Sequence, residues 1–257
     1  VGPTARGKSD LSLELAQNMG GEIINADSIQ VYDGLDIGSA KPPSADLKKV
    51  MHHLIGHIPK GQKYTAGQFR KDVLQVLEQR VALGQKLFFV VGGSGFYLKA
   101  LMTDLYEIPK IPESIQKEIA ALPLQEQYSK LAELDPVYAQ KINANDSYRI
   151  ARGLEVCLAT GEKFSEIQKK FSKKSFPYSY QKIGLKLEKP ALKERVILRS
   201  QKMLDQGLIE EVRGLLEQGY SDWPALESVG YKEVKMFLQK QLPQEKLLEE
   251  IVRGTMA

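Results

Sequence analysis

The chain has 257 residues, 42% of them hydrophobic and 26% charged, which allows one or two domains with a sizeable core. No apolar run approaches the roughly eighteen residues of a membrane span, and no signal-peptide pattern opens the chain, so we expect no membrane partner. The single cysteine, Cys157, excludes an internal disulfide framework and fits a cytoplasmic protein, and the net charge of +4 permits an RNA partner without requiring one.

The first hundred residues alternate between short apolar runs and helical patterns. The predicted elements are, in chain order, a helix over 8–19, a strand over 22–25, a helix over 65–83, a strand over 87–91 and a helix over 96–102. This alternation predicts a parallel α/β sheet that binds its ligands at the carboxyl ends of the strands.

The pattern changes after Pro109 and Pro112, where the segments up to about residue 171 are typical of short helices. A strand is then predicted over 181–187, a long helix over 191–218, and further helices around 226–239 and 244–256. Because the chain opens at Val1 on a glycine-rich loop and ends at Ala257 within a helical pattern, we expect a segment of a longer protein.

The loop before the first helix reads G-P-T-A-R-G-K-S, which matches the phosphate-binding motif G-x-x-x-x-G-K-[ST]. Its glycines let backbone amides turn toward phosphate oxygens, and the helix that begins near Lys8 offers its positive end. Lys8 is the expected point charge for a diphosphate, and the Ser9 hydroxyl the expected ligand of Mg²⁺. The predicted phosphate-binding residues are Gly2, Pro3, Thr4, Ala5, Arg6, Gly7, Lys8 and Ser9.

This motif and the alternation of strands and helices predict a P-loop NTPase-like parallel sheet core, and the short helices between 113 and 171 predict an inserted all-helical domain. The predicted boundaries are 1–111 for the first part of the core, 112–178 for the helical insertion and 179–257 for the second part of the core.

The strand over 87–91 argues against an ordinary ATPase or GTPase. Such proteins usually hold magnesium partly through an acidic residue at the end of a hydrophobic strand. Here the strand is followed by Gly92, Gly93, Ser94 and Gly95, which carry no carboxylate. The motif alone therefore leaves the identity of the phosphate donor open.

Asp27 is the first candidate for acid–base chemistry, because it follows the strand over 22–25 and should lie near the phosphate loop. A carboxylate there can take a proton from an attacking nucleophile. An Asp-Ser pair, here Asp27 and Ser28, also commonly caps a turn or a helix. Spacing alone does not decide between the two roles.

Several motifs in order resemble one known family. They are G-P-T-A-x-G-K-S, A-D-S-x-Q-x-Y, I-G-S-A-K-P, H-H-L-I and G-G-S-G-F-Y, followed by R-I-A-R-G-L-E-V over 149–156 and G-Y-K-E over 230–233. Together they look like the tRNA dimethylallyltransferases (tRNA isopentenyltransferases) across essentially the whole chain. The adenylate isopentenyltransferases are similar in the same core, but the helical stretch and the motifs after it favour the tRNA enzymes.

The resemblance implies a transferase that moves a dimethylallyl group from dimethylallyl diphosphate to the exocyclic amine of the adenine next to the anticodon in tRNA. It implies that Asp27 is the general base, that Ser94 lines the reaction channel, and that Arg199 reaches the diphosphate. Arg195 lies four residues earlier, on the same face of the predicted helix as Arg199. The residues that the resemblance places against the tRNA are Asp27, Ser28, Ile29, Gln30, Ser94, Arg149, Arg152, Gly230, Tyr231 and Lys232.

Two further groups of side chains have simpler interpretations. The only histidines, His52, His53 and His57, have no cysteine and no clear carboxylate partner at metal-ligand spacing, so we assign them to packing or turns. Lys169, Lys170, Lys173 and Lys174 form a basic run that suits either RNA or a solvated face.

Two other classes of protein share part of this pattern. A P-loop small-molecule kinase would have the same phosphate loop, but it would need ATP and an acid for magnesium. An RNA-binding module without activity would have the basic residues but no need of Lys8 or Asp27. We expect a cytoplasmic monomer with tRNA, dimethylallyl diphosphate and Mg²⁺ as its partners.

Overall fold

The computed structural model describes residues 1–256 except Pro3, 104–110 and 171–175, and the side chain of Lys170 is also not described. The described residues form two compact units. One consists of Val1–Leu101 with Tyr178–Ala257, and the other of Met102–Pro177. The sequence placed the two boundaries at 111/112 and 178/179, whereas the units divide at 101/102 and 177/178.

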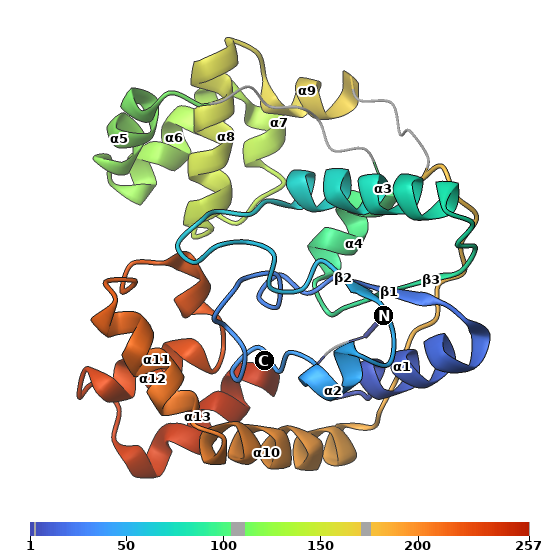
Figure 1. Ribbon diagram of the computed structural model, residues 1–257. Helices are drawn as coiled ribbons and strands as arrows, with labels where there is room; N and C mark the ends of the chain where they lie inside the picture. The colour runs from blue at the N-terminus through green and yellow to red at the C-terminus, as the bar shows by residue number, and fades with distance from the viewer. Residues whose placement is uncertain (3, 104–110, 171–175, 257) are drawn as a thin grey trace. The chain divides into compact units, whose positions relative to one another are not determined.

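The first unit contains a parallel sheet of three strands in the order β2-β1-β3 (Figure 1). β1 (Glu22–Asn25) pairs with β2 (His52–His53) through Ile23 opposite His52, and with β3 (Phe88–Val91) through Ile23 opposite Phe89. All four residues of β1 are buried, which explains why this central strand shows no alternation of polar and apolar residues. The predicted α/β core with parallel strands is confirmed.

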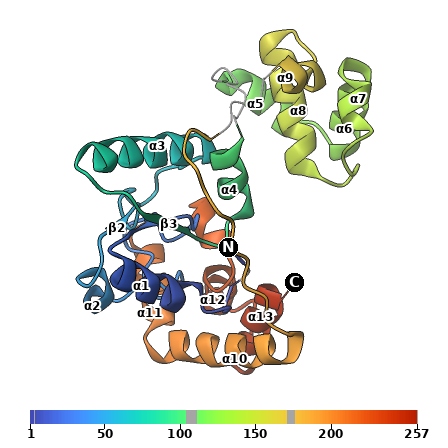
Figure 2. The same ribbon diagram turned by 90° about the vertical axis from the view of Figure 1, so that its right-hand side faces the viewer.

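Helices cover both faces of this sheet. Figures 1 and 2 show α1 (Lys8–Met19) on one side and α3 (Ala66–Ala82) with α4 (Gly95–Met102) on the other. Thr65 caps α3, since its hydroxyl accepts a hydrogen bond from the Gln68 amide and the Gln68 side chain accepts one from the Thr65 amide. A short helix, α2 (Ser44–Leu47), precedes β2.

The C-terminal part of the first unit is helical. Its elements are α10 (Lys189–Asp205), α11 (Leu208–Glu217), a 3-10 turn over Pro224–Glu227, α12 (Tyr231–Leu238) and α13 (Gln244–Met256). Their apolar faces enclose a core that also takes in Val31, Tyr32 and Leu35 from the segment after β1. The chain immediately after β1 is therefore fixed against helices nearly two hundred residues away in sequence.

Two predicted elements of this region are wrong. The single helix over 191–218 is two helices, because Gly207 adopts a left-handed backbone with φ of +99° between α10 and α11. Residues 181–187, all of them described, form no strand. They run extended beside Val1, whose amino group donates to Ile183 O and whose carbonyl accepts from the Leu185 amide.

The second unit is all-helical in its described part, as the sequence predicted. Its helices are α5 (Glu113–Ala120), α6 (Leu124–Leu134), α7 (Pro136–Ala139), α8 (Ser147–Thr160) and α9 (Phe164–Lys170) (Figure 2). Asp135 is fully buried among them and accepts hydrogen bonds from the Tyr138 amide and from the amide and hydroxyl of Ser165. Both oxygens of this buried carboxylate accept hydrogen bonds, so Asp135 joins α7 to α9.

Candidate active site

The phosphate-binding loop leads directly into α1. Gly7 precedes the helix, and the Leu11 amide donates to Gly7 O at 3.2 Å in the first turn. The amino end of α1 and the side chains of Lys8 and Ser9 meet at one end of a cavity of about 1130 Å³. The predicted residues that line this cavity are Thr4, Ala5, Arg6, Gly7, Lys8, Ser9, Asp27, Gln30 and Arg199. Pro3 lies outside the described residues, and Gly2 is not among the lining residues.

Positive side chains gather at this end of the cavity. α10 brings Arg195 and Arg199 to the loop, and a Cβ placed on Gly7 would lie 3.5 Å from Arg195 Nη1. Burial lowers the pKa of the Lys8 ammonium, the Arg199 guanidinium lowers it further, and Asp27 opposes the shift. Burial likewise lowers the pKa of Arg199, again opposed by Asp27. Partly buried cations that line one cavity and repel each other form a site for a multiply charged anion.

Asp27 faces these cations from the end of β1. Its Oδ1 accepts hydrogen bonds from the amides of Ile29 at 2.9 Å and Gln30 at 3.3 Å, so this oxygen caps the turn that follows. Its own amide donates to Asn25 Oδ1 at 3.1 Å, while Asn25 Nδ2 donates to Leu54 O at 2.9 Å. The carboxylate is thus held in place through one oxygen and lines the cavity, so capping does not exclude a role as base.

Ser94 joins the ends of two neighbouring strands. Its hydroxyl accepts from the Ser28 amide at 2.9 Å and donates to Ser28 Oγ at 3.1 Å. Ser94, Ser28 and Ile29 were all predicted to meet substrate, but none of the three is among the lining residues of the cavity. Their described contacts fix the chain directly after Asp27.

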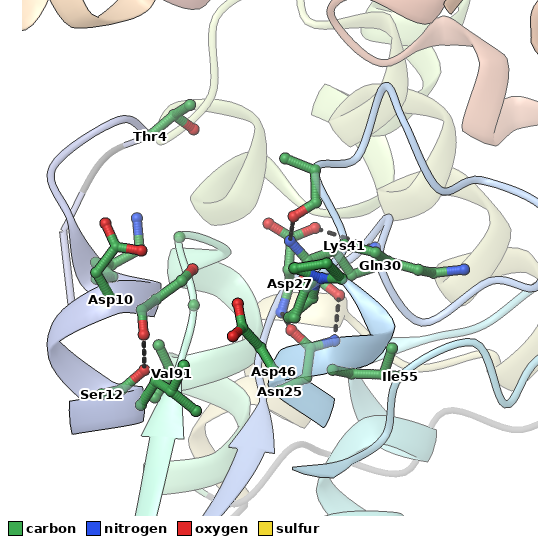
Figure 3. Close-up of a pocket in the computed structure, with 18 of the residues that line it drawn as sticks. Thr4, Asp10, Ser12, Asn25, Asp27, Gln30, Lys41, Asp46, Ile55 and Val91 are labelled. Atoms are coloured by element: carbon green, nitrogen blue, oxygen red, sulfur yellow. Dashed lines mark hydrogen bonds between the residues drawn. The ribbon is translucent and has the colours of Figure 1, made fainter. Parts of the chain in front are cut away.

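The far side of the cavity is formed by a loop whose residues had no predicted role. Asp36, Ile37, Ala40 and Lys41 line it, and Gln30 lies beside them. Figure 3 shows Thr4, Asp10 and Ser12 on one side and Asp27, Gln30 and Lys41 on the other. These loop residues fall within or next to the I-G-S-A-K-P motif, and this motif is the sequence signal that could have identified them as part of the site.

Comparison with known proteins places this site in a family. The model of the IPP transferase family matches residues 30–257, nearly nine-tenths of the chain. The chain belongs to the IPP transferase family. It is 40% identical to the tRNA dimethylallyltransferase of Bdellovibrio bacteriovorus over 99% of this chain and 84% of that one. This relative also spans the phosphate-binding loop that precedes the family match.

Solved structures agree with this family. A full-length tRNA isopentenylpyrophosphate transferase from Bacillus halodurans superposes with a TM-score of 0.70 at 31% identity, covering 99% of this chain and 81% of that one. A eukaryotic dimethylallyltransferase acting on tRNA gives a TM-score of 0.84 at 28% identity, covering 99% and 65%. The predicted family and fold class are both confirmed.

One residue that the family resemblance placed against tRNA is inaccessible. Tyr231 is fully buried, and its hydroxyl donates to Glu211 Oε1 at 2.7 Å and accepts from the Ser39 amide at 3.1 Å. The side chain does not reach solvent in this structure, and its predicted contact with RNA stays a prediction. Gly230 beside it is also buried, whereas Lys232 is exposed.

The predicted RNA contacts of the helical unit stay predictions. Both arginines lie on α8 and form ion pairs close in sequence, Arg149 with Asp146 and Arg152 with Glu155, the latter at 2.8 Å. Arg149 also lies beside the helix cap, since its amide donates to Asp146 Oδ1. In the basic run, Lys169 pairs with Glu166 at 2.8 Å, and Lys173 and Lys174 lie outside the described residues.

The three histidines have other partners. His53 Nε2 lies 2.7 Å from Glu22 Oε2, His52 Nδ1 lies 2.8 Å from Val50 O, and His57 Nε2 lies 3.6 Å from Asp72 Oδ2. Across the described part of the chain, no three His, Cys, Asp or Glu side chains are grouped so that they could hold a metal ion. Among the same residues, no helix is both long and apolar enough to cross a membrane.

Proposed function

We propose that this chain transfers a dimethylallyl group from dimethylallyl diphosphate to the exocyclic amine of the adenine next to the anticodon in tRNA. The observation that carries the proposal is one cavity with Lys8, Arg195 and Arg199 on one side and the Asp27 carboxylate facing them. The relatives with known names, tRNA dimethylallyltransferases among them, support the same reaction.

The chemistry is a substitution at an allylic carbon. The bond between this carbon and the diphosphate oxygen breaks, and its electron pair leaves with the diphosphate. The adenine amine supplies the pair for the new carbon–nitrogen bond and loses one proton. Lys8, Arg199 and the loop amides stabilise the charge that grows on the departing diphosphate.

Asp27 is our proposed acceptor of the amine's proton. The hydrogen bonds that described residues donate to its carboxylate fall on Oδ1, which leaves Oδ2 to take the proton. The amine of adenine is a weak nucleophile, so its orientation matters as much as the basicity of Asp27. A base in an RNA loop can leave its stack at modest cost and enter such a pocket.

Mg²⁺ is the proposed cofactor. The Ser9 hydroxyl lines the cavity next to Lys8, and hydroxyl and diphosphate oxygens are the hard ligands that this ion prefers. Ser9 would hold the ion, which would neutralise part of the diphosphate charge. We also propose that the protein acts as a monomer in the cytoplasm, the compartment in which its tRNA substrate is found.

A small-molecule kinase is the alternative that an experiment must exclude. We expect dimethylallyl diphosphate with Mg²⁺ to raise the melting temperature more than ATP does at equal concentration. At one hundred times its dissociation constant a ligand adds about 2.7 kcal/mol of stability. The protein should also transfer the labelled prenyl group to unmodified tRNA. Release of phosphate from ATP without any prenyl transfer to tRNA would overturn the proposal.

A further inference from the structure

Four consecutive backbone amides in the loop after β1 donate to two side chains from distant helices. Glu211 on α11 accepts from Asp36 and Ile37 through Oε2, at 3.0 and 2.8 Å, and from Gly38 through Oε1 at 3.1 Å. The Tyr231 hydroxyl on α12 accepts from Ser39 at 3.1 Å. Successive amides that converge on one anion form a strong local constraint on the backbone.

The two side chains also hold each other. Tyr231 donates its hydroxyl hydrogen to Glu211 Oε1 at 2.7 Å. Burial raises the pKa of the Tyr231 phenol, and the Glu211 carboxylate raises it further, so the phenol stays protonated and keeps donating. Gly38 lies directly on the ring, because a Cβ there would come within 2.6 Å of Tyr231 Cε2. The loop therefore fits against the pair closely.

The other face of the same loop lines the cavity. Asp36, Ile37, Ala40 and Lys41 are lining residues, whereas Glu211 and Tyr231 are not. The loop also fixes Gln30, whose Nε2 donates to Ser39 O at 3.0 Å and Ala40 O at 3.1 Å. Any movement of residues 36–40 would break the hydrogen bonds of the Gln30 side-chain amide. It would also move the side of the cavity that faces the phosphate-binding loop.

We infer that Glu211 and Tyr231 are positioning residues for the transfer reaction: they set the loop over 36–41 and, through it, Gln30 on the acceptor side of the cavity. This inference rests on the proposed function. It also gives the buried Tyr231 a role that acts through the loop instead of through contact with RNA. Because Thr4 of the phosphate-binding loop lies on the opposite side of the cavity (Figure 3), changes to Glu211 and Tyr231 should affect the tRNA acceptor and leave binding of the diphosphate unchanged.

The test compares Tyr231→Phe and Glu211→Gln with a control, Leu247→Ala. Phenylalanine keeps the packing of the ring and removes only the hydroxyl, while glutamine keeps the size of Glu211 and replaces one accepting oxygen with a donor. Leu247 is buried in the same helical core and makes no hydrogen bond to the loop among those described. All three changes should lower the melting temperature, so stability alone does not separate them.

Kinetics and hydrogen exchange separate them. We expect kcat/KM for tRNA to fall by about 10- to 100-fold in both polar variants, because small misplacements of reacting groups cost this much. The dissociation constant for dimethylallyl diphosphate, measured by calorimetry, should stay within about twofold. The amides of residues 36–39 should exchange faster. Leu247→Ala should change none of these quantities well below its melting temperature.

Three results would count against the inference. If both polar variants exchange faster over 36–39 but keep kcat/KM for tRNA, the loop position does not matter for transfer. If they lose diphosphate affinity in proportion to activity, their role is general support of the fold. If the unmodified protein transfers no prenyl group to tRNA, the proposed function fails first and the inference with it.

Discussion

The two sides of the cavity are built in different ways. The cation wall, formed by residues 4–9 with Arg195 and Arg199, takes its geometry from one loop and from the regular spacing of α10. The loop wall, formed by Asp27, Gln30 and residues 36–41, is irregular backbone held by Glu211 and Tyr231. Each part of the first wall is a regular local element, whereas the second wall depends on hydrogen bonds from side chains of distant helices.

This difference assigns each wall its own half of the proposed reaction. Fixed positive charges suit a leaving group that is charged before and after the bond breaks. A flat, neutral base needs shape and hydrogen-bond partners, which irregular backbone can supply at many angles. If this division is correct, changes to one wall should affect one substrate and spare the other.

The largest effect should come from Asp27→Asn. Asparagine keeps the shape and still accepts hydrogen bonds from the Ile29 and Gln30 amides, but it cannot take up the amine's proton. We expect the single-turnover rate to fall by about 10²- to 10⁴-fold with the melting temperature nearly unchanged. A large fall in melting temperature with normal turnover would show that Asp27 is a cap and not a base.

The next largest effect should come from Lys8→Ala and Arg199→Ala in the cation wall. Each removes a charge-assisted hydrogen bond to the leaving diphosphate, which should cost about 2–4 kcal/mol in the transition state. Binding of tRNA should hardly change. Lys193→Ala is the matched control, since this lysine is exposed on α10 but does not line the cavity. Full activity in Arg199→Ala would contradict our assignment of α10 to the diphosphate.

The same contrast explains what the sequence could predict. The helix after the phosphate-binding loop and strands β1 and β3 follow from local patterns, and the structure contains them. That Lys8, Asp27 and Arg199 line one cavity was expected only from the family resemblance, because these residues are far apart in the sequence. The break at Gly207 was missed because apolar residues continue in helical spacing on both sides. The burial of Tyr231 was missed because it depends on Glu211 and Ser39, which are twenty and almost two hundred residues away.

A smaller effect should come from the basic run of the helical unit, which belongs to neither wall. Neutralising Lys169, Lys170, Lys173 and Lys174 together should weaken tRNA binding and flatten its dependence on salt, by up to about one unit of slope for each phosphate that the variant no longer neutralises. Affinity for dimethylallyl diphosphate should not change, because the cation wall is intact. An unchanged salt slope would mean that these lysines form only a solvated face.

The smallest effect should come from Glu22→Gln, which tests whether the sheet is merely a rigid base for the two walls. Glu22 begins β1, at the opposite end of the strand from Asp27, and its carboxylate binds Arg80 on α3 and His53 on β2. It is buried, with 6% of its surface exposed, so removing the charge should lower the free energy of unfolding by about 1–2 kcal/mol. For a chain of this size that corresponds to a fall of roughly 2–8 °C in melting temperature.

The pH dependence gives this last prediction its control. The hydrogen bond from Arg80 lowers the pKa of Glu22 below its ordinary value of 4.5, burial opposes the shift, and His53 adds to it. A carboxylate with a depressed pKa in the folded protein stabilises it above the pKa of the unfolded chain, and this contribution disappears as the pH falls through the lower, folded value. The difference in unfolding free energy between the unchanged protein and Glu22→Gln should therefore have its full size at pH 6–7 and disappear below about pH 4.5. Kinetic constants for both substrates should match those of the unchanged protein at pH 7, since neither wall contacts Glu22. A fall in kcat without loss of stability would mean that the sheet transmits position to the cavity, and the separation of the two walls would then be incomplete.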